Sequence, residues 1–247
     1  MVSVAVIILC AVLFSFGLRI KKFQIAEIVV EGETVVPPAK IVALANSILD
    51  TKYLLLFSQR NTLFYPRKTI VSAVIESFDR ILSAELDVAR DNTLIVHVAD
   101  RKPYATWCGS VKVPGAADCY FIDAAGRIFA SAPYFSGTAF IKYYGVVAGE
   151  PVGAQLLDQE RFGELGRFIL SLRDLDLEPQ DVVLGPAAHE VYFRGGSKII
   201  FNPDDPFKDI FENLKTVLSS AGFANRASST HPFEYIDLRF DNRVFYK

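Results

Sequence analysis

The sequence has no excess of positive charge. Its 247 residues include 26 lysines and arginines against 28 aspartates and glutamates, which gives a formal net charge of -2 at pH 7. Proteins that hold nucleic acid usually carry a basic surface, because contacts to the phosphate backbone supply much of their affinity. Short basic stretches such as Lys21–Lys22 and Arg101–Lys102 are more typical of solvated loops or membrane-flanking segments. We therefore expect no nucleic-acid partner.

Recognisable signatures of metal binding, nucleotide binding and catalysis are also lacking. The three histidines are His97, His189 and His231, and none has a second histidine or cysteine two to four residues away, as common metal sites require. No phosphate-binding loop, dinucleotide-binding glycine pattern or G-x-S-x-G motif is present. Paired aspartates such as Asp204–Asp205 lie at expected helix boundaries, where aspartate normally caps a helix. The sequence predicts no metal, no cofactor, no small-molecule substrate and no enzymatic activity.

Cysteine is scarce, with three residues in the chain. Cys10 lies in an apolar run, whereas Cys108 and Cys119 end two strand-like runs around a loop that contains glycine and proline. Antiparallel pairing of those runs would bring Cys108 and Cys119 face to face. A disulfide is reasonable outside the cytoplasm and improbable inside it. We predict that the two cysteines are paired and that the domain carrying them faces an oxidising compartment.

The one long apolar run lies at the N-terminus, where residues 1–18 carry no charge. As a helix this run would span about 27 Å, close to the thickness of a bilayer core. A cleaved signal peptide is the alternative, but its basic first region is missing. We expect an uncleaved anchor with membrane lipid around residues 1–22. The orientation of the anchor stays open. Arg19, Lys21 and Lys22 follow the apolar run, and basic residues on that side favour a cytoplasmic C-terminal part. A basic tail upstream of the run would reverse this preference.

The first folded region, residues 23–101, is predicted to have the element order β-α-α-β-β. Strand-like runs cover residues 23–31, 81–89 and 93–99. In the last of these, Leu94, Val96 and Val98 alternate with polar and smaller positions, which is typical of a half-buried strand. Between the first two runs, prolines precede two helical patterns of apolar residues at three- and four-residue steps: Ile41, Leu44, Ala45 and Ile48, then Ile70, Val71, Val74, Ile75 and Phe78.

The second region, residues 102–247, is predicted to be a mainly antiparallel β domain with two helices, so that the whole chain is α+β. Asp123 to Gly126 and the pair Gly195-Gly196 have the turn chemistry of hairpins. Two helical patterns follow these hairpins in turn. Their apolar residues are Phe162, Leu165, Phe168, Ile169 and Leu172 in the first, and Phe207, Ile210, Phe211, Leu214, Val217 and Leu218 in the second.

Three motifs give the chain a family resemblance. Ala99–Trp107 reads A-D-R-K-P-Y-A-T-W and is similar to the E-R-K-P-x-A-x-W segment with which FtsQ/DivIB cell-division proteins leave their POTRA domain, with Asp100 in place of the usual glutamate. Phe121–Phe129 is similar to the strand-D-x-x-G-strand hairpin of that family, and Tyr235–Phe240 to its terminal Y-x-D-L-R segment. The order β-α-α-β-β is also that of a POTRA domain.

The resemblance implies a single-pass protein of the cell membrane, with an anchor in residues 1–22, a POTRA domain in residues 23–101 and an FtsQ-like β domain in residues 102–247. Both folded domains would be extracytoplasmic. Its function would be to dock other proteins of the division complex, including partners resembling FtsB and FtsL. One alternative is a POTRA-containing component of polypeptide transport or envelope assembly. Another is a membrane-tethered hydrolase, which would need a catalytic set that the sequence does not offer.

The candidate partner-binding residues lie in the last thirteen positions. Ile236, Leu238 and Phe240 alternate with Tyr235, Asp237 and Arg239, so we expect the first set to be buried and the second to face outward. A terminal strand is favoured at a sheet edge, where unpaired backbone groups can accept an incoming strand. The alternative is that the stretch only completes the core. The predicted partner-binding residues are Tyr235, Asp237, Arg239, Val244, Phe245 and Tyr246.

Overall fold

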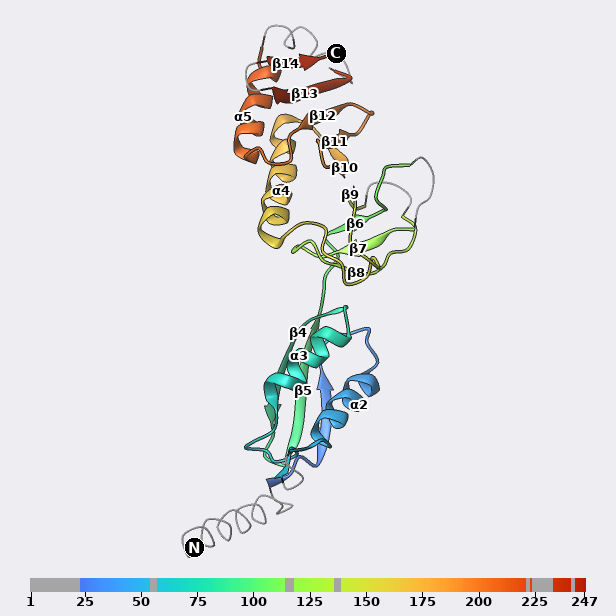
Figure 1. The fold of residues 1–247 in the computed structure, drawn as a ribbon, viewed down its shortest axis with the longest axis vertical. Helices are drawn as coiled ribbons and strands as arrows, with labels where there is room; N and C mark the ends of the chain where they lie inside the picture. Colours follow the sequence, from blue (N-terminus) through green and yellow to red (C-terminus); the bar gives the residue numbers. More distant parts are fainter. Residues whose placement is uncertain are drawn as a thin grey trace, which may run out of the picture. The chain divides into compact units, whose positions relative to one another are not determined.

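The computed structural model describes residues 23–53, 57–113, 118–135, 139–220, 223, 233–240 and 243–247 (Figure 1). The chain divides into two compact units, Met1–Arg101 (unit 1) and Lys102–Lys247 (unit 2). Helices and sheets occur in both, so the predicted α+β class is confirmed. Among the described residues no helix is both long and apolar enough to span a bilayer. The anchor expected in residues 1–22 lies outside the described residues.

Unit 1 is a three-stranded sheet with two helices. Its strands are ordered β1-β5-β4, and the central strand β5 pairs parallel to β1 and antiparallel to β4. A short hairpin, β2–β3, stands between the helices and was not predicted. The elements are β1 (Glu27–Glu31), α2 (Pro38–Leu49), β2 (Lys52–Tyr53), β3 (Phe57–Ser58), α3 (Arg67–Ser77), β4 (Ile81–Val88) and β5 (Thr93–Asp100).

The two helices of unit 1 cover one face of its sheet (Figure 1). Helix α2 begins at Pro38, where the missing N–H of proline is not needed, and its apolar stripe is buried through Ile41 and Ala45. The alternation predicted for β5 is confirmed, because Leu94, Val96 and Val98 are buried against the helices. The residues between them therefore project from the opposite face, which no helix of the described chain covers.

Unit 2 is built on a nine-stranded sheet in the order β14-β13-β12-β11-β10-β9-β6-β7-β8. Its elements are β6 (Ala105–Trp107), β7 (Tyr120–Ile122), β8 (Ile128–Ser131), β9 (Lys142–Gly145), α4 (Gln159–Ser171), the 3-10 helix η2 (Leu172–Leu175), β10 (Pro179–Leu184), β11 (His189–Phe193), β12 (Lys198–Phe201), α5 (Phe207–Leu218), β13 (Tyr235–Phe240) and β14 (Arg243–Tyr246). The predicted hairpins are present as β7–β8 and β11–β12.

The sheet of unit 2 is mixed: five pairings of its described strands are antiparallel, in agreement with the predicted mainly antiparallel domain, and three are parallel. Strands β9 and β10 are parallel and joined through α4, and strands β12 and β13 are parallel and joined through α5. Strand β6 is also parallel to β9. Both crossover helices lie on the same side of the sheet (Figure 1). A parallel pair needs a long crossover connection, usually a helix, and the two predicted helices serve that purpose.

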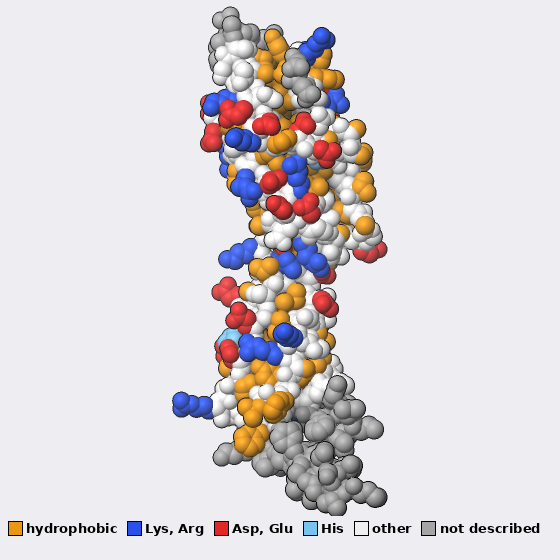
Figure 2. All heavy atoms as spheres, turned by 60° about the vertical axis from the view of Figure 1, so that its left-hand side comes forward, with side chains coloured by type: hydrophobic (Ala, Val, Ile, Leu, Met, Phe, Trp, Pro, Cys, Tyr) orange, Lys and Arg blue, Asp and Glu red, His pale blue; other side chains and the backbone are white. Residues whose placement is uncertain are grey.

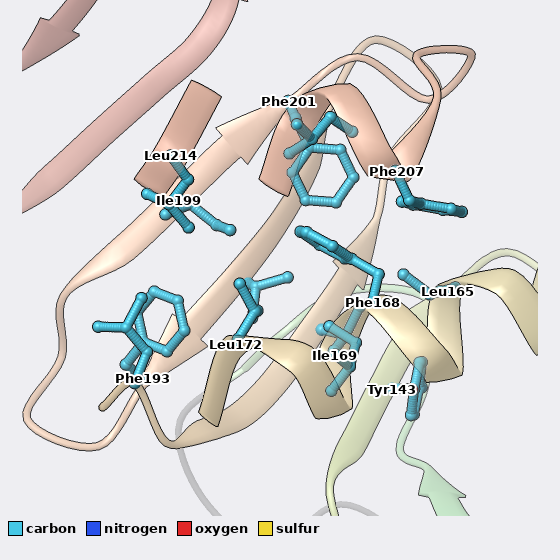
Figure 3. Close-up of a cluster of buried hydrophobic side chains, with 14 of the residues drawn as sticks. Tyr143, Leu165, Phe168, Ile169, Leu172, Phe193, Ile199, Phe201, Phe207 and Leu214 are labelled. Atoms are coloured by element: carbon cyan, nitrogen blue, oxygen red, sulfur yellow. The ribbon is translucent and has the colours of Figure 1, made fainter. Parts of the chain in front are cut away.

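The core of unit 2 lies between this sheet and the helices α4 and α5. Figure 3 shows Phe168 of α4 directed at Phe201 of β12, with Phe207 of α5 beside them. The rings of Phe168 and Phe201 meet edge to face at 5.5 Å, and those of Phe168 and Phe207 stack at 5.3 Å. Helix α4 is capped by Asp158, whose side chain accepts a hydrogen bond from the backbone N–H of Arg161. We call the other face of the sheet, which α4 and α5 do not cover, its open face (Figure 1).

Candidate partner-binding site

Strand β14 ends the unit 2 sheet on one side, and β8 ends it on the other. Strand β13 is paired on both sides, parallel to β12 and antiparallel to β14. The sequence had suggested that the Tyr235 segment itself would lie at an edge, and this is wrong because the chain turns back after Phe240 and adds one more strand. Within the described part of the chain, nothing pairs with the outer side of β14.

The outward backbone groups of this edge can be assigned from its pairing. The N–H of Lys247 donates to the carbonyl of Tyr235 at 3.2 Å, and the carbonyl of Lys247 accepts from the N–H of Glu234 at 2.5 Å. Lys247 thus directs both of its backbone groups toward β13. Backbone groups alternate in direction along a strand, so Val244 and Tyr246 direct theirs away from the sheet. We call these groups, with the side chains of Phe240, Phe245 and Tyr246, the β14 edge.

The burial pattern of β13 differs from the simple alternation expected. Ile236 and Leu238 are buried as predicted, but Phe240 is 49% exposed. The register between β13 and β14 shifts between Asp237 and Phe240, where β13 has one residue more than its partner. Such a bulge reverses the side-chain order that follows it. Phe240 therefore meets Phe245 edge to face at 5.2 Å on the open face instead of entering the core.

Asp237 and Arg239 form a tight ion pair, but Asp237 is buried rather than facing outward. The exposed fraction of the side chain is 10% for Asp237 and 35% for Arg239. The Asp237 carboxylate accepts hydrogen bonds from Nε and a terminal nitrogen of Arg239 at 2.9 and 2.7 Å, and from its backbone N–H at 3.2 Å. The hydrogen bonds from the Arg239 side chain hold the pKa of the Asp237 carboxyl below its usual value. This pair stiffens the strand next to the β14 edge.

The remaining predicted residues divide between core and surface. Val244 is half-buried and packs on the core of unit 2. Tyr235 is also half-buried and stands opposite Lys198 of β12. Phe245 is 48% exposed and Tyr246 is 45% exposed. The ring of Tyr246 lies 4.7 Å from that of Phe223, a residue of the unit 2 core.

A charge network on the open face was missed by sequence reasoning. Lys112 pairs with Asp181 at 2.9 Å, and its ammonium group lies 3.6 Å from the centre of the Tyr192 ring. Lys198 pairs with Glu190 at 3.1 Å, and the Tyr192 hydroxyl donates to the same Glu190. Burial, and next the hydrogen bond to Glu190, raise the pKa of the Tyr192 phenol. The alternation of β11 was the available signal, because Val191 and Phe193 are buried with Tyr192 between them.

Cys108 and Cys119 are joined by a disulfide. Cys108 follows β6 and Cys119 precedes β7, one step beyond the paired residues Trp107 and Tyr120, and their Cα atoms lie 4.2 Å apart. Lys112 belongs to the loop that the disulfide closes, so the bridge limits how far this lysine can move from Asp181 and Tyr192.

The described residues hold no group of histidine, cysteine and carboxylate side chains suited to a metal ion. His231 lies outside them. No protein-family model matches the chain, and no curated protein matches it either. The arrangement at the β14 edge suits protein binding: it combines unpaired backbone groups, which can extend the sheet, with exposed aromatic rings, which are favoured contacts at interfaces.

Proposed function

We propose that this protein is a non-enzymatic, membrane-anchored scaffold of the bacterial cell-division complex, which docks other division proteins on its C-terminal sheet. The observation that carries the proposal is the β14 edge. Two outward backbone positions, Val244 and Tyr246, stand beside the exposed rings of Phe240 and Phe245. A partner strand laid along β14 would gain main-chain hydrogen bonds from the edge and apolar contact from the rings.

The resemblance to the FtsQ/DivIB family supports this function. Its first motif runs from the end of β5 in unit 1 to β6 in unit 2. Its second forms the β7–β8 hairpin and its third is β13, so each motif contributes a strand to the unit 2 sheet. In the second motif, Asp123 accepts hydrogen bonds from the backbone N–H groups of Ala125 and Arg127, and Gly126 has a φ of +85°. The order β1-α2-α3-β4-β5 in unit 1, with both helices on one face, agrees with a POTRA domain.

An extracytoplasmic position is part of the proposal. Residues 1–22 would anchor the chain, and units 1 and 2 would lie outside the cytoplasm. The Cys108–Cys119 disulfide supports this orientation, because structural disulfides persist in oxidising compartments. The partners would be proteins resembling FtsB and FtsL, one of which adds a strand to β14.

Depletion and complementation in dividing cells test the function. We expect cells depleted of the protein to fail in septation and to be restored by the full chain but not by the double variant Phe240→Glu, Phe245→Glu. The matched control is Val146→Glu, Val152→Glu, which places two carboxylates at apolar positions of the same unit that are 78% and 40% exposed. Normal division of depleted cells would contradict the proposed function. Equal restoration by both variants would contradict the proposed site.

A further inference from the structure

The open face of the unit 1 sheet presents a regular grid of side chains. Strand register places Glu31, His97 and Glu85 in one row across β1, β5 and β4. The next row is Val29, Ile95 and Asp87. A third row begins with Glu27 opposite Thr93. These residues alternate with the buried ones, so they project from the face that α2 and α3 do not cover.

The charge of this face has one sign. Four carboxylates stand on the two flanking strands, at Glu27, Glu31, Glu85 and Asp87, and all four residues are exposed. None of the three strands contains a lysine or an arginine. The helices on the other face have an excess of positive charge: α2 and α3 contain Lys40, Arg67 and Lys68 and one acidic residue, Glu76. Figure 2 shows a different distribution over the face of unit 2 that it draws, where acidic and basic side chains are interspersed.

The centre of the grid is apolar. Val29 is 36% exposed and stands opposite Ile95, which is half-buried on the central strand. His97 lies beside this pair with its imidazole nitrogens 3.5 Å from Glu31 and 3.4 Å from Asp87. Val29, Ile95 and His97 therefore lie among the four carboxylates. Glu27 and Glu31 stand before and after Val29 on β1, and Glu85 and Asp87 stand across β5 on β4.

We propose that this sheet face docks an amphipathic helix of a partner protein in which a narrow aliphatic stripe is flanked by lysine or arginine. Adjacent strands lie about 4.8 Å apart. Strands β1 and β4, which carry the carboxylates on either side of β5, are therefore about 10 Å apart, which matches the width of a helix. An aliphatic stripe would cover Val29 and Ile95, and basic residues on either side of it would reach Glu31 and Asp87. This inference concerns unit 1 and does not depend on the function proposed for unit 2.

The sign of the charge decides between classes of partner. Nucleic acids and membranes rich in anionic lipid are both negatively charged, and the carboxylates of β1 and β4 would repel them. An acidic peptide would be repelled for the same reason. A basic helix is the partner whose charge pattern complements the grid, and its attraction should weaken as salt screens the pairs.

Binding of a designed probe to the full chain tests this proposal. The probe is a labelled helical peptide of about 18 residues, or five turns, with leucine along one stripe and lysine on both flanks. We expect fluorescence anisotropy to show saturable binding that weakens with added salt. A peptide with glutamate in place of each lysine, and one of the same composition in scrambled order, should not bind.

Charge reversal then locates the site. The double variant Glu31→Lys, Asp87→Lys should weaken peptide binding by at least about tenfold, because attraction becomes repulsion on both flanks. The matched control Glu76→Lys, Glu212→Lys makes the same change in net charge at two exposed helix positions away from the grid and should bind as the wild type does. No binding by the wild type, equal binding of the glutamate peptide, or equal weakening in both double variants would overturn the proposal.

Discussion

Arg239 donates two side-chain hydrogen bonds to Asp237, its neighbour two positions back on β13, although Asp237 is almost fully buried. Residues two apart on a strand share a face, which allows two of the three guanidinium nitrogens to reach one carboxylate. The pair lets a charge sit inside the sheet next to the β14 edge. A buried carboxylate without such a partner would be costly.

Removal of the arginine should therefore destabilise unit 2. For Arg239→Met we expect a loss of about 1–2 kcal/mol in the free energy of unfolding, less than for a fully buried pair because Arg239 is partly exposed. The pKa of Asp237 is lowered in the folded state, so this contribution is full above the ordinary aspartate pKa of about 4 and is lost as pH falls through the folded value. Denaturant unfolding at several pH values should show the two proteins converging in acid.

The exposed pair Arg194–Glu178 supplies the control for that experiment. Both side chains are well exposed, at 71% and 66%, so Arg194→Met should cost less than about 0.5 kcal/mol. If Arg239→Met were no more costly than Arg194→Met at neutral pH, the Asp237–Arg239 pair would not stabilise the strand.

Local patterns predicted the helices and hairpins because these depend on residues close in the sequence. The helical spacing of apolar residues that includes Ile41 and Ala45 predicted α2, and the spacing that includes Phe168 and Ile169 predicted α4. The turn chemistry of Gly195-Gly196 placed the β11–β12 hairpin, where both glycines have positive φ. In each case the residues that determine the element are close together in the sequence.

Long-range pairing was not predictable in the same way. The parallel neighbours β12 and β13 are separated by the whole of α5, and hydrophobic pattern alone does not choose which strand a crossover returns to. The bulge before Phe240 reverses the alternation on which the orientation of that ring was predicted. The edge position of β14, the burial of Asp237 and the exposure of Phe240 were therefore visible only in the structure.

His189 should make the stability of unit 2 depend on pH. His189 is 6% exposed, and its ring meets that of Phe201 edge to face at 5.8 Å. Burial lowers its pKa, with Arg161 acting in the same direction and Asp204 in the opposite one. Stability is therefore full above the ordinary histidine pKa of about 6.5 and is lost as pH falls below it.

The test is thermal unfolding of the wild type and of His189→Gln between pH 8 and pH 5. We expect the wild type to lose about 3 °C more than the variant, which corresponds to roughly 1 kcal/mol in a domain of this size. Parallel pH profiles for the two proteins would show that His189 is not the titrating group.

The disulfide should stabilise unit 2 by closing a short loop. Replacement of Cys108 and Cys119 by serine should lower the free energy of unfolding by about 3 kcal/mol. Calorimetry with and without reductant provides the check, since reductant should destabilise the wild type and leave the double variant unchanged. A wild type that is insensitive to reductant under unfolding conditions would contradict a structural bridge.

Gly32 should be intolerant of any side chain. It has a φ of +117°, and a Cβ added there would overlap the backbone carbonyl oxygen of Val98. Gly149 also has a positive φ, of +71°, but a Cβ at that position would meet nothing within 4 Å. We expect Gly149→Ala to cost about 1 kcal/mol through backbone strain alone and Gly32→Ala to cost more than about 3 kcal/mol. Hydrogen exchange of β5 amides reports the loss in unit 1, and similar costs for the two changes would contradict the predicted overlap.

The central claim, that a partner adds a strand to β14, is tested most directly by amide hydrogen exchange of the full chain with a purified FtsB-like protein. Val244 and Tyr246 direct their N–H groups away from β13, so these amides should exchange rapidly in the free protein and become protected when the partner binds. The amide of Lys247 already bonds to Tyr235 and should change little. Partner binding that leaves the amides of Val244 and Tyr246 in rapid exchange would show that the partner docks elsewhere.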